Sequence, residues 1–560
     1  MKLSKTGRLA WLLRQAPVWL PFLLGLWVIV LRPLGSHLEN IPGDLGDARF
    51  NSYVLEHFFR WLTGLDRDYW NAAIFFPYQK SIAFSDNLLG SAPLYALFRF
   101  AGLERISAFQ GWYVLSFCCN YLAAAYVLSR LKLAPLAVGV GAFYFTFGLP
   151  LLAQENHAQL LYRFGIPLAC FFLWRFYEKP RLGTLVAVAF WLTWQFFLTI
   201  YVGIFLLILL AVMAVLLPVF VPEPRLVDRL TLWPRRLREG WLQSSRLERL
   251  LSGLAILALG AGLAALLFPY RQASILYSFR RTWAEVSSLL PNPQSYLLAD
   301  RSLIWQADRT ISGGHSNLVE QQLFPGAGAI GLILIGVVGR FRYKYSRLAW
   351  LSLAAAVALV IVTLDIHGFS FYHVLWKLPG MDSLRAIPRI ILVILWPLAL
   401  FCAWTVSAVL NTPPRTAWLK AGMFLLIGLL VAESFFFDYQ TFTRAENQAR
   451  LEAIRQQIPA TLPQNPVLFV AKKPTDLGVP TEIDAMLVAQ DLGWPTLNGY
   501  SGNFPPGYST TPTCRQMRLR IVKYMAFTHL KDPAIYLDLI RRVVPIDASD
   551  CNPAWWNSMP

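Results

Sequence analysis

The amino-acid sequence predicts an all-α polytopic membrane protein with a small α/β region outside the membrane. The first observation is composition: hydrophobic residues make up 56% of the 560 residues and charged residues only 15%, which is rare in a soluble globular chain of this length. The second is a series of apolar runs of membrane-spanning length. The third is that basic residues gather in the short connectors between those runs.

About eleven runs are long enough to cross a bilayer, since a span needs roughly 20 apolar residues. They lie near 15–34, 108–129, 135–153, 160–177, 183–200, 202–221, 250–269, 323–339, 348–366, 390–409 and 418–436. The stretch 184–221 is too long for one helix, so we expect it to divide near Tyr201. The first run follows basic residues as a signal peptide does, but its length and the lack of a small-residue cleavage site predict a transmembrane helix.

The formal net charge of +18 indicates membrane topology and not a nucleic-acid partner. The connector 222–249 alone contains seven arginines, whereas the connector 154–160 has no Lys or Arg. Because basic connectors stay on the cytoplasmic side, we expect a cytoplasmic N-terminus and an extracytoplasmic C-terminus. The outer side then receives three loops and the tail, at 35–107, 270–322, 367–389 and 437–560.

This topology divides the chain into a transmembrane domain, 1–436, and an extracytoplasmic C-terminal domain, 437–560. The strand-like and helix-like runs of the tail are VLFVA (467–471) and IYLDLIRRVV (535–544). Cys514 and Cys551 would lie in a compartment that permits disulfides, so we expect a bridge between them.

Two carboxylates, Asp44 and Asp47, follow the first span directly, and an amphipathic segment at 48–62 comes next. Asp47 could cap the helix that this segment predicts by accepting hydrogen bonds from its first amides. A carboxylate at the mouth of a helix bundle could also serve as general base for an incoming hydroxyl. Both interpretations stay open at this point.

A set of short motifs extends over nearly the whole chain. They are GDLGD (43–47), FFPY (75–78), SDNLLG (85–90), AQENHAQL (153–160), EQQLFPG (320–326), LPGMDSLRAIPR (378–389) and NGYSG (498–502). With the long first loop and its two juxtamembrane helices, these motifs resemble the GT-C glycosyltransferases. More narrowly, the chain is similar to a group of bacterial polytopic membrane proteins within that superfamily.

The resemblance implies a GT-C-like bundle in the bacterial cytoplasmic (inner) membrane. It implies transfer of a sugar from a polyprenyl-phosphate-linked donor to a lipid, glycan or protein acceptor on the extracytoplasmic face. Asp47, directly ahead of the first juxtamembrane helix, matches the catalytic base, with Asp44 as the alternative or its helper. Many family members have two adjacent acidic residues here, whereas this chain separates them by Leu45 and Gly46. Asp86 of the SDNLLG motif is an expected substrate-binding residue.

Further substrate-binding candidates lie in the other outer segments. The forked guanidinium groups of Arg385 and Arg389 suit the donor phosphate, although both could simply extend to lipid headgroups. His157 and Gln159 lie in the short turn near the first loop, where they could bind sugar, phosphate or a metal, or be plain polar interface residues. Glu320 could complete the site or be a solvated residue ahead of the next helix.

The sequence contains no HExxH, paired CxxC or P-loop motif, so no cofactor is indicated and a divalent metal stays open. Two other classes of function stay open too: a flippase or transporter for lipid-linked glycans, and a noncatalytic envelope-assembly subunit. A transporter should carry ionisable residues within its spans. The predicted spans are nearly free of them, with Gln195 and Asp365 among the few polar side chains, which favours chemistry in the outer loops.

Overall fold

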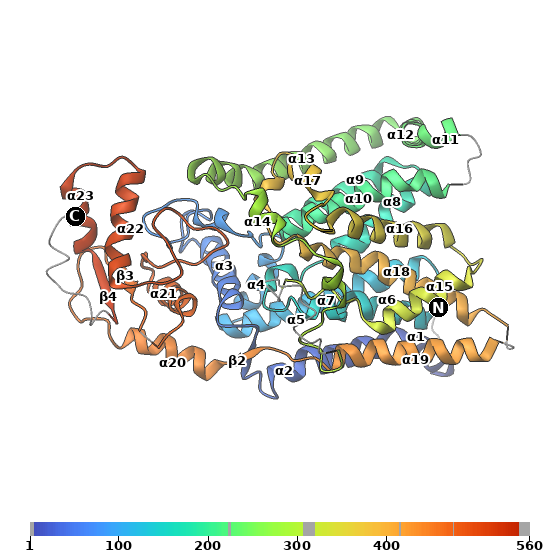
Figure 1. Ribbon diagram of the computed structural model, residues 1–560, viewed down its shortest axis with the longest axis horizontal. Coiled ribbons are helices and arrows are strands. Elements are labelled where there is room, and N and C mark those ends of the chain that lie inside the picture. The colour runs from blue at the N-terminus through green and yellow to red at the C-terminus, as the bar shows by residue number, and fades with distance from the viewer. Residues whose placement is uncertain (1–4, 222–225, 306–319, 414–415, 474, 548–560) are drawn as a thin grey trace.

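Helices dominate the computed structural model, which describes residues 5–221, 226–305, 320–413, 416–473 and 475–547 (Figure 1). Within these ranges, eight helices are long and apolar enough to cross a membrane. They are Arg14–Leu34 (the end of α1, Lys5–Gly25, running on into α2, Arg32–Leu34), α5 (Arg105–Arg130), Pro135–Leu152 (α6, Pro135–Phe147, with α7, Leu149–Leu152), α10 (Ile200–Phe220), α13 (Arg246–Tyr277), α16 (Ser346–Thr363), Ile387–Leu410 (containing α18, Ile391–Leu410) and α19 (Ala417–Phe435). Three shorter helices, α8 (Gly165–Glu178), α9 (Leu182–Leu198) and α15 (Ala327–Gly339), occupy the remaining expected runs. The chain is therefore an all-α polytopic membrane protein, as the sequence predicts.

The long apolar stretch 184–221 divides where the sequence suggests. Helix α9 ends at Leu198 and α10 begins at Ile200, with Thr199 extended between them at φ −164° and ψ 132°. The expected break near Tyr201 is thus confirmed to within two residues. Since the two helices pack against each other, the chain reverses direction at this point.

Helix α18 forms the centre of the bundle. Every residue from Ile391 to Val409 is buried, as expected of a helix that is apolar all round. It contacts α6, α10, α15 and α16. A Cβ atom on Gly141 of α6 would lie 2.8 Å from the Cβ of Ala403, so small residues allow these two helices to pack closely.

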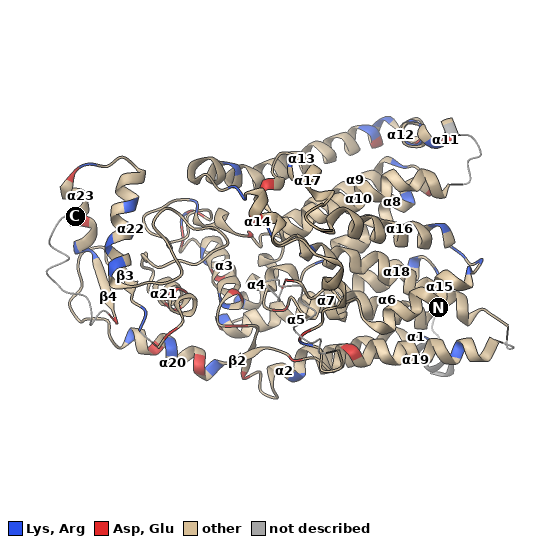
Figure 2. Cartoon of the chain, in the orientation of Figure 1, with Lys and Arg blue, Asp and Glu red and all other residues tan. Residues whose placement is uncertain are grey.

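One end of the bundle carries the long loops and the C-terminal segment (Figure 1). The two juxtamembrane helices expected in the first loop are present as α3 (Asp47–Leu62) and α4 (Ala92–Phe100). The short helices α14 (Trp283–Ser287) and α17 (Tyr372–Trp376) belong to the loops after α13 and α16. At the opposite end lie α11 (Leu226–Leu230), α12 (Leu232–Gln243) and connectors rich in Lys and Arg (Figure 2).

The C-terminal segment mixes helices with short strands. Its elements are β2 (Thr441–Thr443), α20 (Arg444–Arg455), β3 (Val467–Val470), α21 (Gly478–Leu492), α22 (Cys514–Phe527), α23 (Pro533–Arg541) and β4 (Val543–Ile546). Strands β3 and β4 pair in parallel, with Val467 opposite Val543. The run 467–471 therefore contains a strand as expected, whereas the run 535–544 ends its helix at Arg541 and continues as strand β4.

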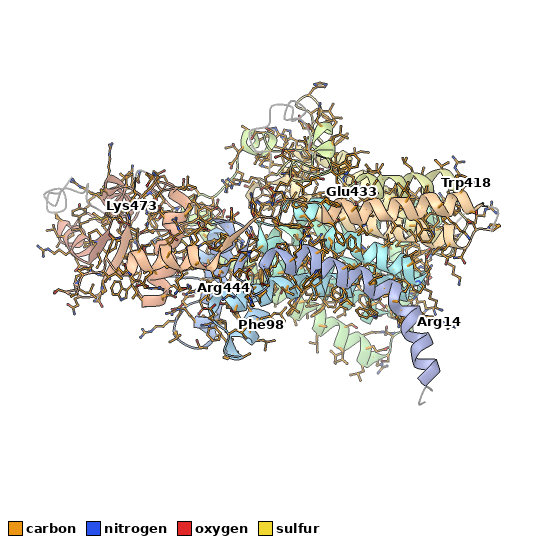
Figure 3. The ribbon with its side chains drawn as sticks, turned by 90° about the horizontal axis from the view of Figure 1, so that it is seen from below. Arg14, Phe98, Trp418, Glu433, Arg444 and Lys473 are labelled. Atoms are coloured by element: carbon orange, nitrogen blue, oxygen red, sulfur yellow. The ribbon has the colours of Figure 1, made fainter. Side chains whose placement is uncertain are left out.

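The C-terminal segment is joined to the first loop. Strand β2 pairs antiparallel with β1 (Asn40–Pro42), and Arg49 of α3 forms a buried ion pair of 2.5 Å with Asp484 of α21. Figure 3 shows Trp418 and Glu433 toward opposite ends of α19, Arg444 beyond them at the junction, and Lys473 within the C-terminal segment. That residues 437–560 form a separate domain stays a prediction.

Cys514, the first residue of α22, is disulfide-bonded. Cys551, the partner that the sequence suggests, lies outside the described residues.

Candidate functional site

A cavity of about 420 Å³ lies where the first loop, the turn before α8, the loops after α13 and α16, and the C-terminal segment meet. Its lining includes all eight residues singled out in the sequence: Asp44, Asp47, Asp86, His157, Gln159, Glu320, Arg385 and Arg389. These residues come from four separate parts of the chain. The fold therefore brings the predicted residues together, although their roles stay predictions.

The two aspartates of the GDLGD motif have different structural positions. Asp47 is the first residue of α3, and Gly46 before it makes no side-chain cap. Asp44 is the residue that stabilises this helix start, since its Oδ1 accepts hydrogen bonds from the amides of Gly46 (3.1 Å) and Ala48 (3.3 Å). The capping role considered for Asp47 thus belongs to Asp44, and the carboxylate of Asp47 is directed to other partners.

Asp47 lies between an aromatic hydroxyl and an imidazole. The Tyr500 hydroxyl donates to Asp47 Oδ1 at 2.6 Å, and His157 Nδ1 lies 2.7 Å from Asp47 Oδ2. Burial opposes ionisation of Asp47, but the contacts with His157 and Tyr500 outweigh it and lower its pKa. For Asp44, burial and the negative charge of Asp47 raise the pKa. Neighbouring carboxylates whose pKa values are moved apart are typical of acid–base sites.

His157 connects Asp47 to a second charged pair. Its Nε2 lies 3.3 Å from Glu320 Oε1 and 3.1 Å from Arg389 Nη2. Arg389 in turn donates to both carboxylate oxygens of Glu320, at 2.5 to 3.2 Å, and lies over the ring of Tyr201. Burial and the charge of Arg389 oppose protonation of His157, but its contacts with Asp47 and Glu320 raise its pKa. Burial also disfavours the charged form of Glu320, yet Arg389 and His157 lower its pKa strongly.

Two of the predicted residues have structural partners. Asp86 accepts hydrogen bonds from the Thr199 hydroxyl (3.0 Å) and the Ile200 amide (2.8 Å), so it caps the start of α10. Burial raises the pKa of Asp86. Gln159 Oε1 accepts a hydrogen bond from the side-chain Nδ2 of Asn51 at 2.8 Å. These contacts explain both positions without a ligand, although both side chains still line the cavity.

The arginines of the cavity differ in their exposure and in the ion pairs that they already form. Arg389 is nearly buried and paired with Glu320, whereas the side chain of Arg385 is 49% exposed and its nearest carboxylate, Glu285, is 3.9 Å away. Arg281 donates to the carbonyl oxygen of Gly502 at 2.8 Å. Arg385 therefore has the guanidinium most available to an incoming anion.

Sequence reasoning did not single out Tyr500, Arg281 or Tyr201 as site residues. Tyr500 had a signal, because it is the central residue of the NGYSG motif. Arg281 and Tyr201 had none, since a basic loop residue and an aromatic residue near a span end are common in membrane proteins. Among the described residues, no group of three or more His, Cys, Asp and Glu side chains has an arrangement that could hold a metal ion.

No protein-family model and no curated protein matches the sequence. Among solved structures, the archaeal oligosaccharyltransferase AglB from Archaeoglobus fulgidus, in complex with an inhibitory peptide and a dolichol-phosphate, is similar with a TM-score of 0.47 and 13% identity, over 87% of this chain and 64% of that chain. The apo form of the Archaeoglobus fulgidus oligosaccharyltransferase gives a TM-score of 0.48 at 13% identity over the same shares. The arabinofuranosyltransferase AftD from Mycobacteria gives 0.41 at 12% identity, over 82% of this chain and 30% of that chain.

The chain thus spans 64% of the length of the oligosaccharyltransferase and 30% of that of AftD. Since all three TM-scores lie below 0.5, the function has to be inferred from the side chains of the cavity.

Proposed function

We propose that this chain is a membrane glycosyltransferase. It moves a sugar from a polyprenyl-phosphate-linked donor to a lipid, glycan or protein acceptor on the extracytoplasmic face of the bacterial cytoplasmic membrane. Its N-terminus is cytoplasmic and its C-terminus extracytoplasmic. The observation that supports this most directly is the carboxylate of Asp47, which His157 and Tyr500 favour in its charged form, in the same cavity as the exposed guanidinium of Arg385.

The proposed reaction is a single displacement at the anomeric carbon of the donor. Asp47 accepts the proton of the acceptor hydroxyl while the oxygen of that hydroxyl forms a bond to the anomeric carbon. The bond from the carbon to the phosphate oxygen breaks, and its electron pair leaves with the polyprenyl phosphate. Arg385 donates hydrogen bonds to the departing phosphate, whose charge is greatest as the bond breaks. No redox step or further reactant is needed.

The neighbours of Asp47 hold it in the form that this step requires. His157 and Tyr500 favour the carboxylate over the acid, so the base is ready at neutral pH. The backbone of Asp47 begins α3, and its two carboxylate oxygens are oriented by the Tyr500 hydroxyl and by His157 Nδ1. A base held in one orientation loses less entropy in the transition state.

Asp44 is the alternative base within the same proposal. Its raised pKa would make it the stronger proton acceptor, but its carboxylate also stabilises the start of α3, because Oδ1 accepts the backbone amides of Gly46 and Ala48. Accepting a proton would weaken this helix start in each cycle. We therefore assign the base role to Asp47 and a supporting role to Asp44.

The experiment that tests the function compares the envelope glycans and lipids of cells with and without the protein by mass spectrometry. In cells without the protein, we expect one glycan or glycolipid to lack a single sugar. We expect the polyprenyl-phosphate-linked donor of that sugar to accumulate in the same cells. The purified protein should then restore that product from the same donor in a detergent assay and release one polyprenyl phosphate per sugar transferred. Donor that accumulates only on the cytoplasmic side would support a flippase, and unchanged glycans and lipids would contradict the proposal.

A further inference from the structure

A second cavity, of about 370 Å³, lies between α3, the start of α5, and helices α20 and α21. It shares no lining residue with the cavity around Asp47. Arg49, which lines it, follows Asp47 by two residues, and two residues along a helix point about 200° apart. The two cavities therefore lie on different faces of the same helix.

Two carboxylates beside this second cavity are each shared between two arginines, although only Asp491 of the two lines it. Asp484 pairs with Arg49 at 2.5 Å and with Arg450 at 2.5 Å. Asp491 pairs with Arg105 and, at 2.5 Å, with Arg455. The charged lining as a whole consists of four arginines, Arg49, Arg99, Arg105 and Arg455, and three carboxylates, Glu56, Glu104 and Asp491, so the arginines exceed the carboxylates by one.

Arg49 shows this excess most directly. Its side chain is only 3% exposed, yet its Nη1 is buried and has no hydrogen-bond partner among the described residues. Its other nitrogens donate to Asn447 Oδ1 at 2.8 Å and to Asp484. Burial lowers the pKa of Arg49 despite the pair with Asp484. A buried charged donor without an acceptor is costly, and an anion in the cavity would supply one.

The remaining walls give the cavity an amphipathic character. Arg105 is the first residue of a candidate membrane span, α5, and the next turns of that helix contribute Ile106 and Phe109 to the lining. Phe442 and Leu451 line it from the C-terminal segment. Arg105 thus lies at the end of a candidate span beside an apolar wall, where the phosphate of an amphiphile at the lipid surface would be found.

We infer that this second cavity binds a phosphate group, either free or in the headgroup of a lipid, through Arg49 and Arg105. Such a ligand would contact α3 and α5 on one side and the C-terminal segment on the other. Because it would bind the folded protein only, it should raise the unfolding temperature. This site is independent of the proposed transferase activity.

The test uses the full-length protein in detergent, with Arg385→Ala as the background to remove the expected phosphate contact of the first cavity. Inorganic phosphate and a short-chain phosphatidic acid are titrated separately by calorimetry. Arg49→Gln is compared with Arg450→Gln. Both variants remove one partner of Asp484, but only Arg49 lines the cavity.

We expect at least tenfold weaker binding in Arg49→Gln and near-parental binding in Arg450→Gln. Binding of both probes identifies the phosphate group as sufficient, and binding of phosphatidic acid alone identifies a lipid headgroup. Equal affinity in the two variants, or no saturable binding of either probe to the parent, overturns the inference. If Arg49→Gln does not fold, Arg105→Gln replaces it, and unchanged binding in that variant overturns the inference too.

Discussion

Asp44 and Asp47 carry the same side chain three residues apart, yet their surroundings give them opposite properties. Asp44 accepts backbone amides at the start of α3 and its pKa is raised, first by burial and then by the charge of Asp47. Asp47 faces an imidazole and a tyrosine hydroxyl, which lower its pKa in spite of burial. At the scale of residues, therefore, the environment and not the residue type separates the helix-stabilising carboxylate from the proposed base.

The raised pKa of His157 makes its contribution to stability depend on pH. Unfolded His has a pKa of about 6.5, and the folded value lies higher. The stabilisation is therefore fully present below about pH 6.5 and is lost as pH rises through the folded pKa. We expect His157→Gln to lower the unfolding temperature at pH 6, as measured by thermal denaturation in detergent. At pH 9 the decrease relative to the parent should be smaller. His37→Gln, at an exposed position, is the control, and a pH-independent effect of His157→Gln would contradict the assignment.

Arg385 should contribute to donor binding through its forked guanidinium. Arg385→Ala removes both hydrogen bonds of a bidentate phosphate contact, whereas Arg385→Lys keeps a charge and one donor. Charge-assisted hydrogen bonds contribute about 1.5–3 kcal/mol, which is roughly a ten- to hundredfold change in Kd. We expect the order of donor affinity to be parent, Lys variant, Ala variant in a calorimetric titration. Equal affinity in the three proteins would leave Arg385 as a lipid-headgroup contact.

At the scale of elements, the site depends on how the NGYSG segment meets the first loop. The amide of Phe75 donates to the carbonyl of Asn498 at 3.0 Å. The side-chain Nδ2 of Asn498 and the backbone amide of Gly499 both donate to Glu482 Oε2 at 2.9 Å. The buried carboxylate of Glu482 therefore fixes the position of the NGYSG segment. This arrangement places Tyr500 where its hydroxyl reaches Asp47.

Gly499 is the position where this contact is tightest. An added Cβ would lie 2.2 Å from the ring of Phe75, which is fully buried. We expect Gly499→Ala to displace Tyr500, to lower the unfolding temperature by several degrees and to reduce turnover. Gly502→Ala is the matched control, because its nearest atom would be 3.2 Å away. An unfolding temperature in Gly499→Ala equal to that of the parent would mean that the segment shifts at little cost.

The sequence predicts spans well and contacts between distant segments poorly. Apolar runs locate the helices, and even the break at Thr199 follows from a run that is too long for one helix. The capping of α3 by Asp44 and the contact from Tyr500 to Asp47 could not be predicted, since each depends on backbone geometry or on a segment more than 400 residues away. The motifs identified most residues of the cavity because the motifs lie at the same end of the bundle. Arg281 belongs to no motif and was therefore not predicted.

The orientation of the whole molecule in the membrane decides on which side the cavity around Asp47 opens. The long loops and the C-terminal segment lie at one end of the bundle, and Lys- and Arg-rich connectors lie at the other (Figure 2). This separation agrees with the positive-inside rule. In the proposed orientation, the donor and acceptor meet on the extracytoplasmic side.

Cysteine labelling in intact cells tests this orientation. Lys531→Cys and Gln243→Cys both place a thiol at an exposed position, the first in the C-terminal segment and the second at the end of α12. We expect an impermeant maleimide to label position 531 and not position 243. The reverse pattern would contradict the topology and the proposed site of reaction with it.

The most direct test of the central claim is the rate of sugar transfer by purified Asp47→Asn. This change keeps the size of the side chain and removes the basic carboxylate, while Asp44 still stabilises the start of α3. We expect donor binding and the unfolding temperature to stay near those of the parent and turnover to fall by roughly a hundred- to ten-thousandfold. Asp44→Asn is the control and should retain more activity than Asp47→Asn. A folded Asp47→Asn that transfers sugar at the parental rate would contradict the account, and a dead Asp44→Asn beside it would assign the base role to Asp44.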